Sequence, residues 1–319
     1  MKTPPASGTA VGDEVAARAP HKTVLISGAS GLVGGHLAQA LSARGDRAQG
    51  YSRSPSRLGA PISAGFAWDP QQGPPPPESF QDADAIVHLA GETVQGRWTA
   101  AKKARIRDSR VVGTRNLVAG IERAERRPKT LICASAIGYY GDRGEQGLTE
   151  QDPPGDDFLA EVCRGWEREA QAAEELGVRV VRLRIGLVLA REGGALKEML
   201  LPAKLGAGGP LGGGKQWWSW IHHRDLIRLM LWAIDEEGVA GPLNATAPNP
   251  VRQREFADLL GAQLGRPSFL PAPSFALKLA LGEFSTELLS SKRVLPAAAQ
   301  AAGFRFDFPT LRAALRDLL

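Results

Sequence analysis

Short apolar runs alternate with longer segments of helical periodicity through the first half of the chain. Residues 23–27 (TVLIS) form a β-rich apolar run, and residues 32–44 carry apolar side chains at helical spacing until Gly45. The alternation continues with expected strands at 47–52, 85–89, 130–134 and 178–183, and expected helices at 99–126 and 158–176. Strands and helices in this order predict an α/β fold with a doubly wound parallel sheet of the Rossmann type.

The pattern changes after residue 186. Residues 206–214 (GAGGPLGGG) are dense in glycine, and residues 217–223 (WWSWIHH) are aromatic. Further helices are expected at 225–236, 253–264, 274–282 and 309–318. We therefore predict a Rossmann domain over residues 21–186 and a smaller mixed lobe over residues 187–319. The lobe should cover the C-terminal edge of the sheet, where open α/β sheets bind ligands.

Composition indicates a soluble globular protein in a reducing compartment. Hydrophobic residues make up 43% and charged residues 23% of the chain, and no apolar run approaches the roughly 20 residues of a membrane span. Residues 1–20 are small, proline-bearing and aperiodic, so we expect a disordered tail and no secretory signal. A transit peptide is the weaker alternative, because Asp13 and Glu14 are acidic. The two cysteines, Cys133 and Cys163, do not make a disulfide framework and fit a cytoplasmic location.

Positive charge is concentrated in residues 102–129, within a chain whose net charge is +5. Such a run is typical either of the solvated face of an amphipathic helix or of a nucleic-acid contact. No zinc-ligand spacing or stacking aromatic pattern accompanies it. We therefore predict a solvated helix face and no nucleic-acid partner.

A glycine-rich loop lies between the first strand and the first helix. Residues 27–34 (SGASGLVG) have the form G-x-x-G-x-x-G, in which glycines allow a tight turn, a close backbone approach to pyrophosphate and close helix–strand packing. The helix N-terminus adds unpaired N–H groups and a partial positive charge. The predicted cofactor contacts here are Gly28, Ser30, Gly31, Leu32, Val33 and Gly34.

The second strand predicts which dinucleotide binds. An NAD site usually places an acid near the end of this strand to bind the ribose hydroxyls. Here the strand ends with Ser52 and Arg53, and Asp46 lies at its start, out of reach. Because a guanidinium pairs with a 2′-phosphate, we predict NADP, with Arg53 as the main contact, Ser52 as a donor beside it and Arg57 in reserve.

Several motifs occur together in a characteristic order. Besides the glycine loop and Ser52-Arg53, they comprise residues 88–91 (HLAG), 135–141 (SAIGYYG), 208–212 (GGPLG), 216–217 (QW), 220–225 (WIHHRD), 244–248 (NATAP) and 303–306 (GFRF). This set resembles the extended short-chain dehydrogenase/reductases, the sugar-nucleotide epimerase/dehydratase group. It is most similar to an atypical branch labelled "epimerase family protein", over roughly residues 22–318.

The resemblance implies a nicotinamide cofactor that also contacts Leu89, Ala90, Gly91 and Ser135. It further implies a catalytic Ser or Thr after the strand at 130–134, followed by Tyr-x-x-x-Lys on the next helix. This chain departs from that set, because the helix reads Cys163-x-x-x-Glu167 and the Ser/Thr position holds Ala136, with Ser135 one residue early. Glu167 is anionic and would raise the pKa of a neighbouring thiol, whereas lysine lowers the pKa of its tyrosine.

Other groups are candidates for acid–base chemistry. Tyr139 and Tyr140 follow a strand end where the site should lie, and Tyr140 is the favoured catalytic residue, although a packed aromatic is the equal alternative. Ser135, Cys163 and Glu167 complete the candidate set. A free cysteine is more commonly a small buried apolar residue than a nucleophile.

Substrate contacts are expected from the lobe. Gln216, Trp217 and Trp220 suit an amphipathic ligand, since indole rings stack and an amide donates and accepts; the alternative is that the tryptophans pin the lobe to the sheet. Arg184, at a strand end, is expected to meet an acidic substrate or a cofactor phosphate, or else to form a structural ion pair. Lys204 is a weaker candidate of the same kind.

An acidic residue and two adjacent histidines in the lobe carry further expectations. Asp225 precedes an apolar helical run and is expected to cap or charge the start of that helix. His222 and His223 lack a third ligand at metal-binding spacing, so no metal is predicted.

Two functions remain open from the sequence. The first is an NADP-dependent oxidoreductase or epimerase acting on a small polar substrate, a nucleotide-linked one included. The second is a non-catalytic NADP(H)-binding regulatory protein, because Cys163 and Glu167 replace the usual tyrosine and lysine. A homodimer is considered as the assembly, and no membrane partner is expected.

Overall fold

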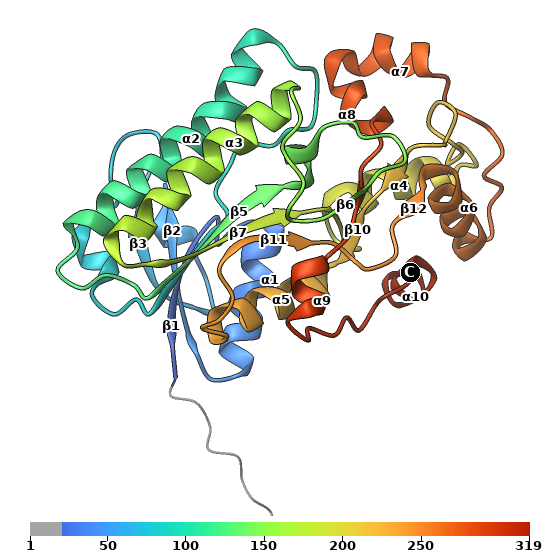
Figure 1. The fold of residues 1–319 in the computed structure, drawn as a ribbon. Helices are drawn as coiled ribbons and strands as arrows, with labels where there is room; N and C mark the ends of the chain where they lie inside the picture. Colours follow the sequence, from blue (N-terminus) through green and yellow to red (C-terminus); the bar gives the residue numbers. More distant parts are fainter. Residues whose placement is uncertain (1–20) are drawn as a thin grey trace, which may run out of the picture.

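The computed structural model describes residues 21–319, and the tail expected over residues 1–20 lies outside the described residues. Seven strands form one sheet in the order β11-β7-β5-β4-β1-β2-β3, and every neighbouring pair is parallel. These strands are β1 (Thr23–Ser27), β2 (Arg47–Ser52), β3 (Ile62–Ala67), β4 (Ala85–His88), β5 (Thr130–Ala136), β7 (Arg179–Ile185) and β11 (Gly241–Ala245). The predicted Rossmann-type sheet is confirmed (Figure 1).

Helices cover both faces of this sheet (Figure 1). On one face, Leu37 of α1 and Met230 of α5 belong to one buried core. On the other face, Leu117 of α2 and Trp166 of α3 belong to a second core. The helices are α1 (Leu32–Ala43), α2 (Ala100–Arg123), α3 (Phe158–Gln171) and α5 (His223–Asp235). Within the described part of the chain, no helix is long and apolar enough to cross a membrane.

The lobe is mixed in composition, as expected. β8 and β10 pair in parallel, whereas β9 and β12 pair antiparallel. Its elements are β8 (Leu187–Leu189), α4 (Gly194–Lys204), β9 (Trp217–Trp218), β10 (Trp220–His222), β12 (Val251–Arg252), α6 (Gln253–Leu264), α7 (Ser274–Leu281), α8 (Ser285–Leu289), β13 (Arg293–Val294), α9 (Ala297–Ala301) and α10 (Leu311–Leu318). Short connecting elements are the 3-10 turns Pro55–Arg57, Pro77–Phe80, Ile137–Tyr140, Ala172–Leu176 and Gly282–Phe284, and strand β6 (Gly147–Leu148).

The elements that the sequence did not predict include two strands of the large sheet and one helix of the lobe. β3 and β11 are the two edge strands of the large sheet, and α4 follows β8. The edge strand β3 alternates half-buried and exposed positions with small residues, and β11 begins Gly241-Pro242, so neither carries a long apolar run. Because α5 and β11 return to the sheet after β8, the linear division at residue 186 does not separate the sheet from the lobe.

Asp225 lies in the first turn of α5 and so adds negative charge at the helix start, as one of its two expected roles requires, but it does not cap the helix. The His222 ring, not Asp225, accepts the backbone N–H of Arg224. Asp225 is fully buried and instead accepts the backbone N–H groups of Asp307 and Phe308, each at 2.9 Å. Its carboxylate therefore fixes the C-terminal segment to the helix start, a contact between positions 82 and 83 residues apart.

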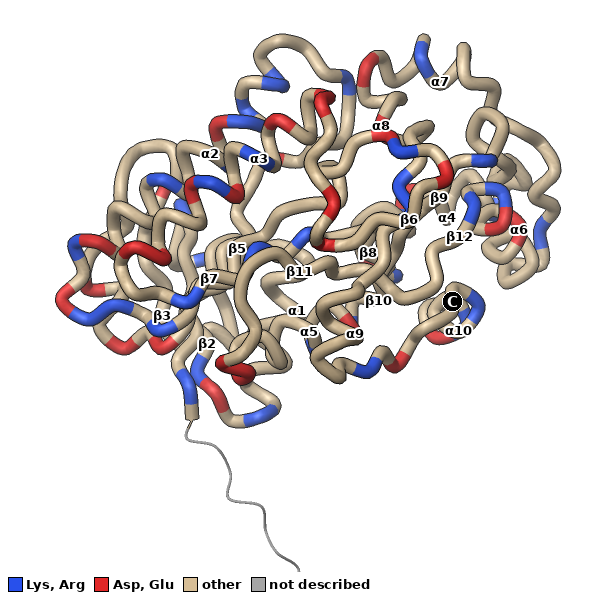
Figure 2. The backbone as a smooth tube through the Cα atoms, viewed as in Figure 1, with Lys and Arg blue, Asp and Glu red and all other residues tan. Residues whose placement is uncertain are grey.

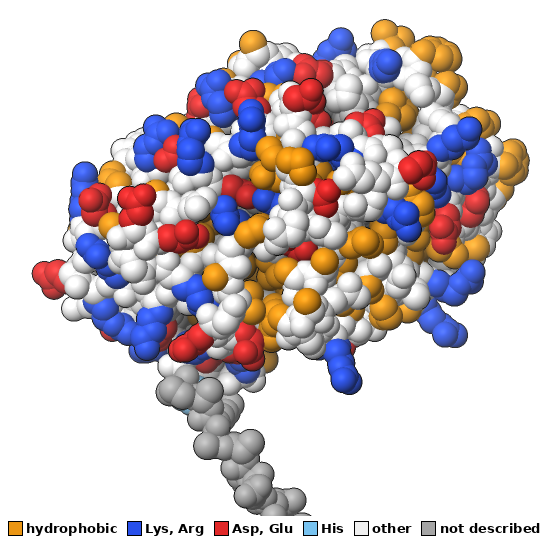
Figure 3. All heavy atoms as spheres, viewed as in Figure 1, with side chains coloured by type: hydrophobic (Ala, Val, Ile, Leu, Met, Phe, Trp, Pro, Cys, Tyr) orange, Lys and Arg blue, Asp and Glu red, His pale blue; other side chains and the backbone are white. Residues whose placement is uncertain are grey.

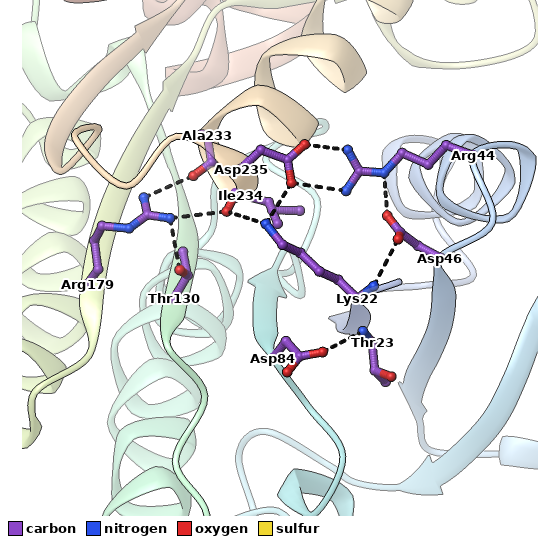
Figure 4. Close-up of polar contacts among 10 residues, drawn as sticks. All are labelled: Lys22, Thr23, Arg44, Asp46, Asp84, Thr130, Arg179, Ala233, Ile234 and Asp235. Carbon is purple, nitrogen blue, oxygen red and sulfur yellow. Dashed lines mark hydrogen bonds and ion pairs between the residues drawn. The ribbon is translucent and has the colours of Figure 1, made fainter. Parts of the chain in front are cut away.

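A polar network fixes the N-terminal edge of the sheet (Figure 4). Asp46 accepts the backbone N–H of Lys22 at 2.9 Å and also pairs with Arg44. The side chains of Lys22 and Arg44 both reach Asp235 at the end of α5. Asp46 is therefore occupied at the end of β2 that faces away from the ligand-binding edge, as the sequence indicated.

The basic stretch around α2 is interleaved with acids (Figure 2). Lys103 pairs with Glu283 at 2.6 Å, and Arg115 pairs with Glu169 at 2.7 Å. Arg126, beyond the helix end, pairs with Asp84. These ion pairs compensate much of the charge that the sequence concentrates there, and a surface of mixed sign results.

Candidate functional site

The loop between β1 and α1 has the tight geometry that its glycines predict. Gly28 has a φ of +74°, and the Gly31 N–H donates to the Gly28 carbonyl at 2.9 Å. A Cβ at Gly34 would lie 2.3 Å from that same carbonyl oxygen, so any side chain there would force the helix away from the turn. The glycines thus hold the start of α1 directly against the end of β1.

The N-terminus of α1 is open to an anion. Gly31 occupies the N-cap position with no side-chain capping bond, and the first turn holds no acidic residue. Ser30 and Gly31 are exposed, and the N–H groups of Leu32 and Val33 are in the first turn, where no intrahelical acceptor exists. Phosphate oxygens would satisfy these donors and interact favourably with the helix dipole.

A second feature of this edge is a surface pocket at the end of β2 and β3. Arg53 is exposed and lines this pocket of about 440 Å³ together with Trp68 and Asp69. The hydroxyl of Ser52, the residue before Arg53, accepts the backbone N–H of Ser54 at 3.0 Å. Trp68 and Asp69 could not be expected from the sequence, because β3, the strand that they follow, carries no long apolar run. An arginine beside an aromatic ring is suited to a phosphorylated nucleoside.

The end of β4 is held by a buried polar group. The Ser27 hydroxyl accepts the backbone N–H groups of Leu89 and Ala90, at 3.0 and 3.1 Å. It also bonds to the His88 ring at 2.6 Å, and the other ring nitrogen of His88 bonds to Thr114. Burial lowers the pKa of His88 to about 4, so the ring is neutral at physiological pH. The segment expected to contact the cofactor therefore has a fixed backbone path.

Four of the predicted site residues form one buried network. Glu167 accepts two guanidinium bonds from Arg184, at 2.8 and 2.9 Å, and a bond from the Ser135 hydroxyl at 2.7 Å. Arg184 also donates to the Tyr140 hydroxyl at 2.9 Å, and this hydroxyl donates to Asn244 at 2.7 Å. The side chains are within a few per cent of complete burial. Arg184 thus makes the structural ion pair that the sequence left as an alternative.

This network determines the protonation of its members. Burial raises the pKa of Tyr140 to about 12, which outweighs the lowering by Arg184, so the phenol is neutral. Burial alone would lower the pKa of Arg184, but the hydrogen bonds and charge of Glu167 outweigh it and raise that pKa. Tyr140 is therefore a fully buried aromatic hydroxyl with its bonds satisfied inside the protein.

A cavity of about 730 Å³ lies between the C-terminal ends of the strands and the lobe. Cys163, Ala136 and Gly138 line it from the Rossmann side, and Trp217 and Trp218 line it from the lobe. Most other wall residues are apolar: Val94, Ile137, Leu159, Val162, Ile185, Leu187, Met199, Leu211, Phe256, Leu260, Leu281, Phe284 and Leu288. None of the four residues of the buried network lines this cavity.

Of the substrate residues predicted in the lobe, one lines the cavity and two are buried away from it. Trp217 lines the cavity, and its ring nitrogen donates to Glu145 at 3.0 Å. Gln216 is buried, and its amide donates to the carbonyls of Leu211 and Leu288, both at 3.1 Å. Trp220 is completely buried in the lobe core. Only Trp217 of these three is open to a ligand in the cavity.

Cys163 lines the cavity as a neutral thiol. Burial and, to a smaller extent, the negative charge of Glu167 raise its pKa to about 12. Its sulfur lies 3.8 Å from the carbonyl oxygen of Ala136. Such a thiol is a poor nucleophile, because the thiolate is the reactive form. Cys133 is buried in the sheet core.

Three potential metal ligands meet at a place that the spacing of His222 and His223 did not reveal. His36 of α1, Glu192 after β8 and His223 of α5 have ligand atoms within 4.8 Å of one another. The His36 ring bonds to Glu192, and its centroid lies 4.5 Å from that of His223. The cluster links α1 to the lobe. The sequence-based prediction that the protein binds no metal is not tested by this cluster and remains a prediction.

Fold and phosphate loop together define a Rossmann-type nucleotide-binding class. The NAD dependent epimerase/dehydratase family matches residues 24–245, and a domain of unknown function (DUF1731) matches residues 272–318. The chain belongs to the NAD dependent epimerase/dehydratase family, and the resemblance drawn from its motifs is confirmed.

The chain is similar to individual relatives along most of its length. The chain is 40% identical to the Arabidopsis thaliana "Epimerase family protein SDR39U1 homolog, chloroplastic", over 93% of this chain and 86% of the relative. It is 38% identical to Bacillus subtilis "Epimerase family protein YfhF", over 93% and 97%. The structure of human epimerase family protein SDR39U1 (isoform 2) with NADPH superposes with a TM-score of 0.84 at 35% identity, over 93% and 98% of the two chains.

Proposed function

We propose that this chain binds NADP(H) and is a short-chain-type oxidoreductase or epimerase that acts on a small molecule in the 730 Å³ cavity. The observation that carries the proposal is the open N-terminus of α1 combined with Arg53 at the end of β2. A 35%-identical human relative was solved with NADPH, which supports the same cofactor here. The cofactor would supply a hydride donor or acceptor.

Each cofactor contact has a defined physical role. The N–H groups of Leu32 and Val33 would donate to the pyrophosphate, and Arg53 and Ser52 would bind the 2′-phosphate. Leu89 and Ala90, fixed by the Ser27 hydroxyl, would border the nicotinamide half. The cavity would then receive the substrate next to the strand ends and exclude water.

The cavity wall favours a substrate with an apolar body. A nucleotide-linked sugar needs many hydrogen-bonding partners, and a predominantly apolar wall offers few. The polar, nucleotide-linked substrate expected from the sequence is therefore less well supported than an apolar molecule that bears a few polar groups. Trp217 and Trp218 would contribute flat apolar surface.

The positions and protonation of the candidate acid–base residues support a second function. Neither Tyr140, Ser135 nor Glu167 lines the cavity, and Cys163 is a neutral thiol. A non-catalytic NADP(H)-responsive protein needs only the cofactor site and a conformation that depends on it. We keep this alternative because the residues at the usual tyrosine and lysine positions cannot perform their usual chemistry.

Purified protein tests both functions. NADPH affinity is measured by calorimetry, and oxidation of NADPH is followed with a panel of apolar ketones, aldehydes and enones. Turnover above that of a Gly31→Glu variant supports the enzyme. Tight NADPH binding without turnover across the panel supports the regulatory alternative, particularly if Cys163→Ala and Tyr140→Phe preserve cellular function while Gly31→Glu abolishes it. Absence of NADPH binding would refute both.

Location and assembly complete the proposal. Both cysteines are free and buried, which suits a cytoplasmic location, although one relative's name places that protein in the chloroplast.

The homodimer stays a prediction, and light scattering of the purified chain tests it. Salt-dependent binding to duplex DNA tests the prediction that α2 contacts no nucleic acid.

A further inference from the structure

One arginine in the wall of the cavity has no carboxylate partner among the described residues. Arg110 of α2 lines the cavity beside Cys163, is half-buried, and was hidden in the sequence within the basic run at 102–129. Its Nη1 donates to the backbone carbonyls of Glu92 and Ile106, at 2.9 and 3.0 Å. Within residues 21–319, its Nε and Nη2 make no hydrogen bond, and no carboxylate lies within ion-pair distance.

The other charges near this guanidinium are already compensated. The carboxylate of Glu92 pairs with Lys102 at 2.6 Å. Lys292, the other buried cation of the cavity wall, pairs with Glu287 at 2.9 Å. Burial lowers the pKa of Arg110, which shows that its surroundings disfavour the charge. A charge in such a place is costly unless an anion accompanies it.

The surroundings of Arg110 hold its guanidinium in place. Its Cζ lies 5.1 Å from the centroid of the Trp166 ring. On another side, a Cβ at Gly91 would lie 3.3 Å from the same carbon, so the lack of a side chain at position 91 leaves room for the guanidinium. The cation is therefore fixed at the Rossmann side of the cavity, with two donors left for a ligand.

The lobe side of the cavity is bordered by exposed apolar residues. Leu205, at the end of α4, is 76% exposed, and Leu279 of α7 is 78% exposed. Phe269 and Phe275 are exposed to a similar degree. The neighbouring residues Pro202 and Leu281 line the cavity itself. Figure 3 shows apolar side chains collected over α7, at the upper right of the molecule.

We infer that the substrate is an amphipathic anion, whose acidic group binds Arg110 and whose apolar chain extends through the cavity toward α4 and α7. This inference rests on the proposed function and specifies the substrate class of the same cavity. A carboxylate would accept the two remaining guanidinium donors and compensate the charge. The exposed leucines and phenylalanines at the lobe side would contact the far end of a long chain.

Binding of two matched probes tests the inference without any need for turnover. Calorimetry with NADPH-saturated full-length protein compares decanoate with decanol, which share a chain length and differ in charge. We expect decanoate to bind at least about tenfold more tightly. Arg110→Met should remove this preference, and Arg107→Met, a change at an exposed arginine of the same helix, should preserve it. Met199→Trp, which fills the cavity, should weaken both probes.

Several outcomes would overturn the inference. Equal affinities for decanoate and decanol, no binding of either, or an unchanged preference in Arg110→Met would each contradict it. If Arg110→Met weakened NADPH binding and left decanoate binding intact, the anion at Arg110 would be a cofactor phosphate. The wild-type comparison decides the question if a variant misfolds. Decanoate binding without turnover on any substrate would contradict the enzyme proposal, while Arg110 would still be the anion contact of a ligand bound in the cavity.

Discussion

Glu167 and Arg184 form a bidentate ion pair inside the protein, with N–O distances of 2.8 and 2.9 Å. Their side chains are only 5% and 3% exposed. Glu167 occupies the position where the family resemblance implies a catalytic lysine. Glu167, one turn after Cys163 on the same helix, therefore stabilises the fold. Its ion-pair partner Arg184 also donates to the hydroxyl of Tyr140. This arrangement explains why these candidate residues do not face the cavity.

Breaking this pair should destabilise the fold. Glu167→Gln leaves the guanidinium of Arg184 buried without its counter-charge, so we expect a loss of about 3–5 kcal/mol in the free energy of unfolding. Urea denaturation measures it. The control is Glu169→Gln, which removes a partner of the exposed Arg115 and should cost about 1 kcal/mol or less. Equal losses for the two variants would contradict the structural role.

Arg53 should select NADPH over NADH. Arg53→Ala removes the guanidinium proposed to bind the 2′-phosphate, a charge-assisted contact of about 1.5–3 kcal/mol, so NADPH affinity should fall by about tenfold to a hundredfold. NADH affinity should hardly change. Calorimetry with both nucleotides measures this, and Arg47→Ala, a change at the opposite end of β2, is the matched control. An unchanged ratio of the two affinities in Arg53→Ala would refute the assignment.

Alanine substitutions at two adjacent glycines of α1 should have very different effects on NADPH binding. A methyl group at Gly34 would lie 2.3 Å from a backbone oxygen of the loop, whereas one at Gly35 would have nothing nearer than 3.9 Å. Gly34→Ala should therefore displace the loop and abolish most NADPH binding. Gly35→Ala should preserve binding and gain slightly in helix stability. Comparable NADPH affinity in the two variants would show that the close packing of loop and helix is not required.

Burial of His88 should make stability depend on pH. The pKa of this ring is about 4 in the folded protein and about 6.5 in the unfolded chain, so the unfolded state binds a proton first as pH falls. Stability from this residue is complete above pH 6.5 and declines as pH falls toward 4, by about 3 kcal/mol. His88→Gln should flatten this part of the curve of unfolding free energy against pH. Parallel curves for the wild type and the variant would contradict the shift.

The glycine loop, the first helix and the place of Arg53 directly after a strand could be predicted from sequence, because each depends on neighbouring residues. A turn that needs glycine, a helix period of 3.6 and a strand end are all local patterns. The parallel sheet followed from the order of these patterns, and it is confirmed. The edge strands β3 and β11 were missed, since edges need fewer apolar residues than central strands.

Sequence alone therefore determined the Rossmann fold, the phosphate loop and the replacement of the tyrosine and lysine by Cys163 and Glu167. Only the tertiary structure decided what the side chains face. Arg184 lies 17 residues from Glu167, and Arg110 meets Cys163 from a different helix. Whether an arginine is solvated, paired or left to receive a ligand depends on which distant elements pack against it. The periodicity of a helix or strand does not specify that packing. An uncompensated charge becomes costly only when folding removes it from water.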